Sequence, residues 1–316
     1  MSSDRPFVTR LAPSPTGAQH LGNARTYLIT WLMARQRGGR IVLRIEDIDS
    51  PRVKPDAAAQ LINDLRWLGL DWDDGPIVQS QRISLYAAAL EKLQAQELVY
   101  PCTCTRSDVE QAASAPHPEG AEPIYPGTCA GRSVADAAAL AGRPFAWRFR
   151  VRDVPAFKDG FRGAIALSRE QIGGDFVAWK SHGTPAYQLA VVVDDADNGI
   201  TCVVRGDDLV TSTPRQLLLF SALGLPAPEF VHVPLVVGPD GRRLAKRHGD
   251  TRLSVIRAVG IRAEQVLGLL AWSCGWLATR APVRATELIP RFDLRAIPHQ
   301  PVMLTPELLA SIGYRA

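Results

Sequence analysis

The N-terminal part of the chain alternates between apolar runs and segments with helical periodicity. Residues 7–12 form a short apolar run, which predicts a buried strand, and residues 40–49 form a second run that ends in acidic side chains. Between these runs, apolar residues recur at helical spacing, at Ala24, Tyr27, Leu28, Trp31 and Leu32. The same spacing at residues 54–69 predicts a second helix. Strands and helices in this order predict an α/β fold with a parallel sheet.

This regular order is interrupted in the middle of the chain. A helix expected at residues 83–98 leads into residues 100–104, which contain two cysteines, and then into a stretch at residues 112–121 rich in Pro, Ala, Gly and Glu. We therefore expect an inserted subdomain to begin here. Within it, residues 145–151 alternate like a half-exposed strand, and residues 161–167 form a second candidate strand.

Regular α/β structure is expected to return at residues 175–179. The continuous apolar run at residues 189–194 predicts a strand that is buried between two helical layers. From Val255 onward, Pro and Arg separate segments that we expect to be helices.

Composition and charge limit the class of protein. A chain of 316 residues that is 46% hydrophobic and 22% charged has the composition of a soluble globular protein. Its net charge of +4 is compatible with a phosphate-rich partner but does not require one. The apolar run at residues 266–278 is too short to span a bilayer, and residues 1–6 do not resemble a signal peptide, so we expect a cytoplasmic protein without a membrane partner.

The loop at residues 10–26, which joins the first strand to the first helix, contains Pro, Gly and one His. A strand that enters a helix through such a turn directs backbone N–H groups and the positive end of the helix at one point, which favours phosphate. Gly22 lets a ligand approach the backbone, and His20 can donate a hydrogen bond to a phosphoryl oxygen. Alternatively, His20 only caps the helix and touches no ligand.

Several blocks of the sequence resemble those of class I glutamyl-tRNA synthetases. Residues 10–17 and 20–26 resemble the HIGH-motif region, and residues 243–249 resemble the KMSKS-type loop. Further blocks match in the same order, at residues 44–49, 183–195, 204–209 and 213–216. This series of matches is far more specific than one short motif.

The resemblance implies that the chain activates L-glutamate with ATP. The α-carboxylate attacks the α-phosphorus, a step that requires positioning and charge stabilisation but no protein nucleophile. His20 and Lys246 are then the catalytic residues at the phosphates, and Mg²⁺ completes the neutralisation. The implied ATP site consists of Pro13, Thr16, Gly17, His20, Gly22, Asn23, Arg243 and Lys246.

The KMSKS-type loop departs from the family pattern. Arg243 replaces its first Lys and Ala245 replaces its Ser, so we expect slower activation. Without the other blocks, Lys246 would be interpreted as an ordinary solvated lysine.

A substrate with two carboxylates favours arginines, which bind a carboxylate through two parallel hydrogen bonds. The positions that match the family are Arg10 and Arg205, each in or just after an apolar strand. Glu46 can accept the substrate ammonium and Tyr187 can hydrogen-bond the substrate, and the resemblance adds Ala12 and Ser14 to the glutamate site. Each of these residues, taken alone, could instead have a purely structural role.

The five cysteines predict a metal site rather than disulfides, because three of them lie in one segment of an expected cytoplasmic chain. Cys102, Cys104 and Cys129 provide most of a tetrahedral set for one structural Zn²⁺, whereas Cys202 and Cys274 are expected in the core. Ligand softness favours His117 as the fourth ligand. The short paralogues of glutamyl-tRNA synthetases carry a Cys-x-Cys…Tyr-x-x-x-Cys pattern, which points to Tyr125 instead. The alternative is three unligated cysteines.

The resemblance also suggests a domain organisation. Residues 1–101 form the first half of a Rossmann-type catalytic domain, residues 102–174 a zinc-bearing insertion, and residues 175–228 the second half. Residues 229–316 contain the KMSKS-type loop and a short helical subdomain that resembles a stem-contact region. Only 66 residues follow Asp250, so we expect no anticodon-binding domain.

These features are typical of the truncated paralogues, the glutamyl-queuosine tRNA(Asp) synthetases. They imply activation of glutamate without tRNA and transfer to queuosine in the anticodon of tRNA(Asp), by a monomer. One alternative is a short glutamyl-tRNA synthetase that charges the 3′ end of tRNA(Glu). Another is a non-catalytic zinc-containing RNA-binding protein.

Overall fold

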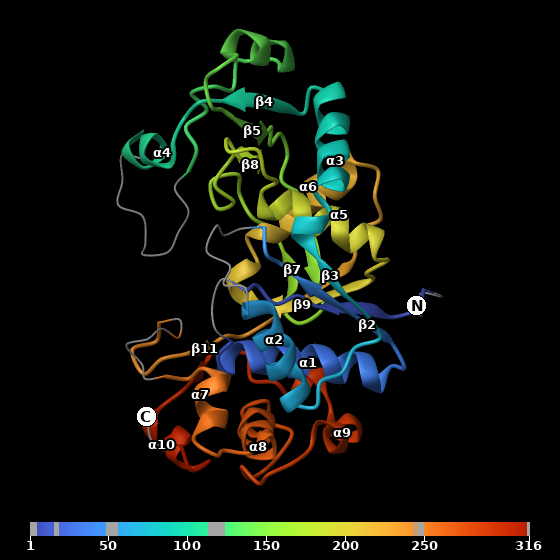
Figure 1. Ribbon diagram of the computed structural model, residues 1–316, viewed down its shortest axis with the longest axis vertical. Helices are drawn as coiled ribbons and strands as arrows, with labels where there is room; N and C mark the ends of the chain where they lie inside the picture. Colours follow the sequence, from blue (N-terminus) through green and yellow to red (C-terminus); the bar gives the residue numbers. More distant parts are fainter. Residues whose placement is uncertain are drawn as a thin grey trace.

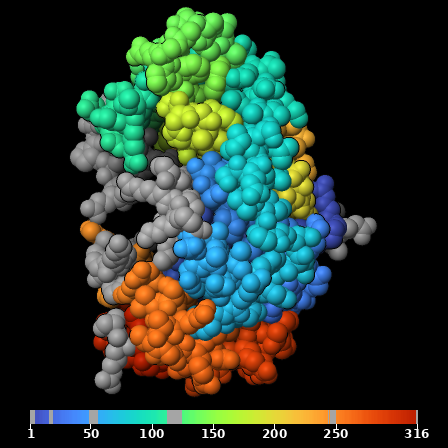
Figure 2. All heavy atoms as spheres, in the orientation of Figure 1, coloured from blue at the N-terminus to red at the C-terminus, as the bar shows by residue number. Residues whose placement is uncertain are grey.

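The computed structural model describes residues 5–15, 19–48, 56–112, 124–242, 244 and 250–314. The molecule is elongated, with a parallel sheet in its middle part (Figure 1). Figure 2 shows the C-terminal segments at one end, in orange and red, and the segment that follows residue 124 at the other, in green. In the part of the chain that the structure describes, no helix has both the length and the apolar character needed to cross a membrane.

Two groups of parallel strands lie side by side in the centre: β1 (Val8–Leu11), β2 (Arg40–Ile45) and β3 (Asp74–Val78) in one, and β9 (Cys202–Gly206) and β10 (Glu229–Val233) in the other. The amide of Thr201 donates to the carbonyl oxygen of Val8 at 2.9 Å, so β9 lies next to β1. The strand order is therefore β3-β2-β1-β9-β10. This arrangement confirms the expected α/β class with a parallel sheet.

The three helices predicted in the first part of the chain are present as α1 (Leu21–Gln36), α2 (Ala57–Trp67) and α3 (Ile83–Ala95). α1 is buried along most of its length because it lies between the parallel sheet and the C-terminal helices (Figure 1). Leu28 and Leu32 of α1 belong to the same apolar core as Leu270 near the C-terminus. The position of α1 thus links the sheet to the C-terminal part of the chain.

The prediction of a strand at residues 189–194 was wrong. These residues belong to helix α5 (Tyr187–Asp197), which is buried from Gln188 to Asp195 between the sheet and neighbouring elements. A short, continuously apolar segment has the same composition in a buried strand as in a helix buried on all sides, so its periodicity could not distinguish them. Helix α6 (Ser212–Ala222) packs beside α5 and leads to β10.

The interrupting segment forms a separate antiparallel sheet of β4 (Val99–Cys102), β5 (Ala146–Phe149) and β8 (Phe176–Trp179). β6 (Phe157–Asp159) and β7 (Gly163–Ile165) form a hairpin, and α4 (Arg106–Ala112) follows β4. The strands expected at 145–151 and 161–167 are thereby confirmed. The segment at 175–179 is also a strand, but it pairs with β5 and does not enter the parallel sheet.

The helices expected after Val255 are confirmed. They are α7 (Leu253–Ala258), α8 (Ala263–Ser273), α9 (Ala285–Leu288) and α10 (Pro306–Ala310). Two short strands, β11 (Val236–Val237) and β12 (Val302–Met303), pair in parallel beside them. Short 3₁₀ turns complete the described chain, at Gln79–Gln81, Val134–Leu140, Asp207–Leu209, Ile289–Arg291 and Leu294–Ala296.

Candidate active site at the carboxyl ends of the parallel strands

A cavity of about 610 Å³ opens where β1, β2 and β9 end and α1 and α5 begin. Nine predicted site residues line it: Arg10, Ala12, Ser14, His20, Gly22, Asn23, Glu46, Tyr187 and Arg205. The carboxyl ends of parallel strands are where α/β proteins bind ligands. Residues far apart in the sequence therefore meet around one space that can hold a small polar ligand.

Some predicted residues cannot be placed around this cavity. Pro13 is buried and is not among the residues that line it. Thr16, Gly17, Arg243 and Lys246 lie outside the described residues, as does the alternative zinc ligand His117. A second cavity, of about 560 Å³, lies around Arg150 and Arg152 and contains no predicted site residue.

His20 is the N-cap of α1 and also lines the cavity. Its Nδ1 accepts a 3.1 Å hydrogen bond from the amide of Gly22, while its own amide donates to Oδ1 of Asn23. In the neutral ring the proton therefore lies on Nε2, the nitrogen suited to donate to a phosphoryl oxygen. The capping expected in the alternative is confirmed, and because it uses Nδ1 it does not exclude a ligand at Nε2.

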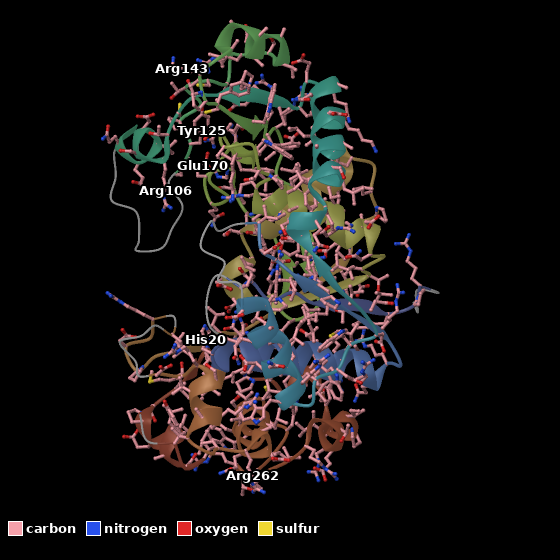
Figure 3. All side chains as sticks on the ribbon, in the orientation of Figure 1. His20, Arg106, Tyr125, Arg143, Glu170 and Arg262 are labelled. Carbon is pink, nitrogen blue, oxygen red and sulfur yellow. The ribbon has the colours of Figure 1, made fainter. Side chains whose placement is uncertain are left out.

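The lack of a side chain at Gly22 gives the imidazole room over the helix start. A Cβ on Gly22 would be 3.0 Å from both Cε1 and Nδ1 of His20. The imidazole would then have to shift by a few tenths of an ångström. Figure 3 shows His20 at this end of α1.

The described flanks of the KMSKS-type loop lie next to the same helix start. Leu244 lines the cavity, and the carbonyl oxygen of Thr251 accepts a hydrogen bond from the amide of Leu21 at 3.2 Å. The amide of Leu253 donates to the carbonyl oxygen of Gln19 at 2.8 Å. The C-terminal flank of the loop is thus hydrogen-bonded to the start of α1, and Leu244 in the loop faces the same cavity.

Arg10 is buried and directs part of its guanidinium group at the cavity. One Nη1 hydrogen bond goes to the carbonyl oxygen of Val204 at 3.2 Å, and Nε lies 3.5 Å from Oδ1 of Asp195. Within the described ranges, no protein acceptor is found for Nη2 of Arg10. This nitrogen is therefore available to a carboxylate in the cavity.

Glu46 is held by Arg44 through one carboxylate oxygen only. Arg44 donates to Oε1 of Glu46 from Nη2 at 3.0 Å and from Nε at 3.2 Å. Burial raises the pKa of Glu46, and this effect outweighs the opposing effects of Arg44 and Arg10. The second carboxylate oxygen has no partner among the described side chains and can accept from an ammonium group.

Two tyrosines complete the wall around Glu46. Tyr27 donates to Oε1 of Gln19 at 2.6 Å, whereas no protein acceptor is found for the hydroxyl of Tyr187 in the described part of the chain. Burial, followed by the nearby Glu46 carboxylate, raises the pKa of Tyr187. Tyr187 therefore remains protonated and can donate a hydrogen bond to a ligand.

The cysteine cluster lies in a different part of the molecule, next to β4 and β5. The Sγ atoms of Cys102, Cys104 and Cys129 all lie within 4.8 Å of one another, and those of Cys104 and Cys129 are 3.7 Å apart. The Tyr125 oxygen is 3.4 Å from Sγ of Cys102 and 3.9 Å from Sγ of Cys104. Zinc–sulfur bonds of about 2.3 Å in a tetrahedron place sulfur atoms just under 4 Å apart, so these atoms fit a zinc ligand set.

The sequence did not reveal several charged residues behind the cavity wall. Arg44 is fully buried beside Asp194 and Asp195, and His232 is fully buried beside Asp159. Charged or titratable residues inside apolar strands were the available signal, because such side chains are rarely buried without partners. The identity of those partners depends on elements far away in the sequence.

Comparisons with known proteins agree with this geometry. The sequence matches the family "tRNA synthetases class I (E and Q), catalytic domain" over residues 6–309. The chain belongs to this family. A solved glutamate tRNA ligase from Elizabethkingia meningosepticum, in complex with its amino acid, superposes with a TM-score of 0.81 at 25% identity. That superposition covers 98% of this chain and 69% of the ligase.

Relatives in this class I family differ in how much of their length the chain covers. "Glutamyl-Q tRNA(Asp) synthetase" of Symbiobacterium thermophilum is 50% identical over 316 residues, 96% of this chain and 98% of that protein. The protein of the same name from Rhodopirellula baltica is 51% identical over 94% of this chain and 96% of its own length. "Glutamate--tRNA ligase" of Geobacter sulfurreducens is 41% identical over 96% of this chain but only 65% of the ligase.

Proposed function

We propose that this chain activates L-glutamate with ATP to glutamyl-adenylate, without needing tRNA, and transfers the glutamate to queuosine in the anticodon of tRNA(Asp). The observation that carries the proposal is the pair of buried arginines, Arg10 and Arg205, in the wall of one cavity that also contains His20 at a helix N-terminus. A dicarboxylic amino acid and a triphosphate are the ligands that this charge distribution favours.

The glutamate site follows from the groups that face the cavity. Nη2 of Arg10 and the Tyr187 hydroxyl can donate to the substrate, and the second oxygen of Glu46 can accept from its ammonium group. Arg205 supplies a second guanidinium group. Ala12 and Ser14 complete the proposed glutamate site at the end of β1.

The proposed ATP site lies at the start of α1. His20 donates from Nε2 to a phosphate oxygen, while Gly22 and Asn23 form the first turn of the helix beneath it. We retain Pro13, Thr16, Gly17 and Arg243 from the sequence prediction, and we assign Lys246 to the phosphates. Mg²⁺ bound with ATP would neutralise part of the phosphate charge.

The insertion holds one structural Zn²⁺ in our proposal, with Cys102, Cys104, Cys129 and Tyr125 as ligands. The short distances between Tyr125 and two of the sulfur atoms favour it over His117 as the fourth ligand. Among the described residues, the apolar cluster of the insertion has only five buried members, and three of them are the proposed ligands Cys102, Tyr125 and Cys129, so a metal would contribute much of its stability. The four-part domain division, the monomeric state and the cytoplasmic location remain predictions.

The similarity to relatives named "Glutamyl-Q tRNA(Asp) synthetase" supports queuosine rather than the 3′ end of tRNA as the acceptor. Those named "Glutamyl-Q tRNA(Asp) synthetase" are matched over 96% to 98% of their length in the first three comparisons, whereas the Geobacter sulfurreducens ligase is matched over 65%. The identities are 50%, 51% and 43% for these three relatives and 41% for the ligase.

Transfer of radiolabelled glutamate to tRNA(Asp) with and without queuosine tests the proposal. We expect transfer only to the queuosine-containing tRNA, unaffected when its 3′-terminal adenosine is trimmed. Charging of tRNA(Glu) that is abolished by this trimming would favour a short glutamyl-tRNA synthetase. No exchange of pyrophosphate in the presence of glutamate and ATP would favour a non-catalytic RNA-binding protein.

The Lys246→Ala variant tests the assignment of the loop lysine. Pyrophosphate exchange should fall by about 100-fold, because the ammonium group stabilises charge that develops in the transition state. The matched control is Lys92→Ala on α3, at an exposed lysine that does not line the cavity. Full exchange activity in Lys246→Ala would remove this role.

A further inference from the structure

Arg205 is a buried cation without a carboxylate partner among the described residues. Its side chain is only 5% exposed, and no ion pair joins it to an Asp or Glu in that part of the chain. Arg44, by contrast, is fully buried against Glu46, Asp194 and Asp195. A buried charge usually has an opposite charge close by. Arg205 is therefore unusual, because its buried guanidinium group has no carboxylate partner among the described residues.

Neutral acceptors hold the Arg205 guanidinium group instead. Nε donates to Nε2 of His232 at 2.9 Å, Nη1 to Oε1 of Gln216 at 2.8 Å, and Nη2 to Oγ1 of Thr213 at 2.7 Å. Each nitrogen is therefore fixed in direction, while the positive charge is not cancelled. The guanidinium group still lines the cavity.

The contact with His232 depends on which ring nitrogen carries the proton. Nε2 can accept from Arg205 only if it has no hydrogen, so the proton must lie on Nδ1. Nδ1 lies 2.7 Å from Oδ2 of Asp159, which accepts that proton's hydrogen bond. Asp159 is itself fixed by the amides of Phe161 and Arg162 at 2.9 and 2.8 Å.

His232 and Asp159 act from behind the cavity wall. Both are buried, with 0% and 2% of their surface exposed, and neither lines the cavity. Burial lowers the pKa of His232; Asp159 opposes this shift, and Arg205 and Arg162 add to it. His232 therefore remains neutral at physiological pH and adds no second charge beside Arg205.

We propose that Asp159 and His232 are positioning residues that hold the Arg205 guanidinium group through a neutral acceptor and so leave its charge to be matched by a carboxylate of glutamate. The inference rests on the proposed function of the cavity. A carboxylate in the place of His232 would make a better ion pair with Arg205, but it would cancel the charge that the substrate needs. The neutral imidazole fixes the geometry without competing with the ligand.

Kinetics of glutamate-dependent pyrophosphate exchange test this proposal in three variants: His232→Gln, His232→Glu and Asp159→Asn. His232→Glu, which places a negative charge beside Arg205, should raise the KM for glutamate by about 100-fold and leave the KM for ATP within about twofold. His232→Gln keeps a neutral acceptor and should raise the KM for glutamate by only about 10-fold or less. Asp159→Asn should resemble His232→Gln, because the amide no longer enforces one position of the ring proton.

Two results would overturn the proposal. One is an unchanged KM for glutamate in His232→Glu, and the other is an equal rise in the KM values for glutamate and ATP, as expected from general loss of structure. If wild-type protein shows no glutamate-dependent exchange, the proposed function itself fails, which is a distinct outcome.

Should the variants not fold, ¹⁵N-histidine NMR of the wild-type chain provides an independent test. We expect one neutral histidine with its proton on Nδ1 that does not titrate near its ordinary pKa. If no histidine is found in that state, the proposal is wrong, whatever the enzyme's activity.

Discussion

Arg44 of β2 donates from Nη1 to Oδ1 of Asp195 of α5 at 2.7 Å, and both side chains are almost completely buried. The same carboxylate oxygen lies 3.5 Å from Nε of Arg10. Burial lowers the pKa of Arg44, but the carboxylates of Asp195, Glu46 and Asp194 raise it by more. This ion pair connects the strand that ends at Glu46 with the helix that begins at Tyr187, so it supports two walls of the cavity.

Replacing Arg44 should strongly destabilise the fold. In Arg44→Met, three buried carboxylates lose their shared cation, which should lower the free energy of unfolding by about 3 to 5 kcal/mol. Chemical denaturation of both proteins measures this difference. Arg44 does not line the cavity.

Arg35→Met is the matched control, because it also removes an arginine with two carboxylate partners. Arg35 pairs with Asp71 and Asp73, whose side chains are 73% and 40% exposed. Solvent screens these pairs, so the loss should be about 1 kcal/mol or less. Equal losses in the two variants would contradict the role of the buried cluster.

The raised pKa of Glu46 predicts a specific pH dependence of stability. A carboxyl group whose pKa is higher in the folded state contributes stability that is fully present below its unfolded pKa and is lost as the pH rises through its folded pKa. Glu46→Gln cannot ionise. The variant should therefore gain stability relative to the wild-type chain as the pH rises from about 4 to about 7, measured by urea denaturation across this range.

The slope of this difference with pH isolates the ionisation of Glu46, because residue 46 titrates in the wild-type chain and not in the variant. Glu91→Gln, at an exposed position of α3, is the matched control. If Glu46→Gln instead loses relative stability as the pH rises, attraction to Arg44 and Arg10 outweighs burial. The same variant should bind glutamate weakly at every pH, since the ammonium acceptor is removed.

The metal site can be tested by zinc content in freshly purified protein. Cys129→Ser should contain well below one zinc per chain, because one of three thiolates is lost. Tyr125→Phe should release zinc at a lower chelator concentration than the wild-type chain, whereas His117→Ala should release it at the same concentration. If His117→Ala instead released zinc at the lower chelator concentration and Tyr125→Phe at the wild-type concentration, His117 would be the fourth ligand.

Cys202→Ala is the control for loss of a buried cysteine. Cys202 is 1% exposed, lies in β9 and is not part of the cluster. Its replacement should leave the zinc content unchanged. A wild-type chain without zinc would indicate that the three cysteines are unligated.

Local patterns identified most of the helices and strands but not their surroundings. The helix spacing at Leu28 and Leu32 correctly predicted α1, because one turn of a helix is a local property. The apolar run at residues 189–194 was wrongly predicted to be a strand, because burial on all sides removes the amphipathic pattern that distinguishes a helix from a strand. Similarly, Arg205 was recognised from its motif, but its neutral partner His232 lies on another strand and gave no signal of its own.

The sequence by itself determined the α/β class and the cluster of three cysteines, since these depend on residue type and short-range spacing. The candidate residues for a dicarboxylate and for phosphate came from the resemblance of its motifs to a family. Only the tertiary structure decided that Arg10 and Arg205 share one cavity, that Tyr125 lies beside the sulfur atoms, and that Arg205 is held by neutral acceptors. Hydrogen bonds and burial join residues separated by as many as 256 positions, and spacing along a chain carries no record of such contacts.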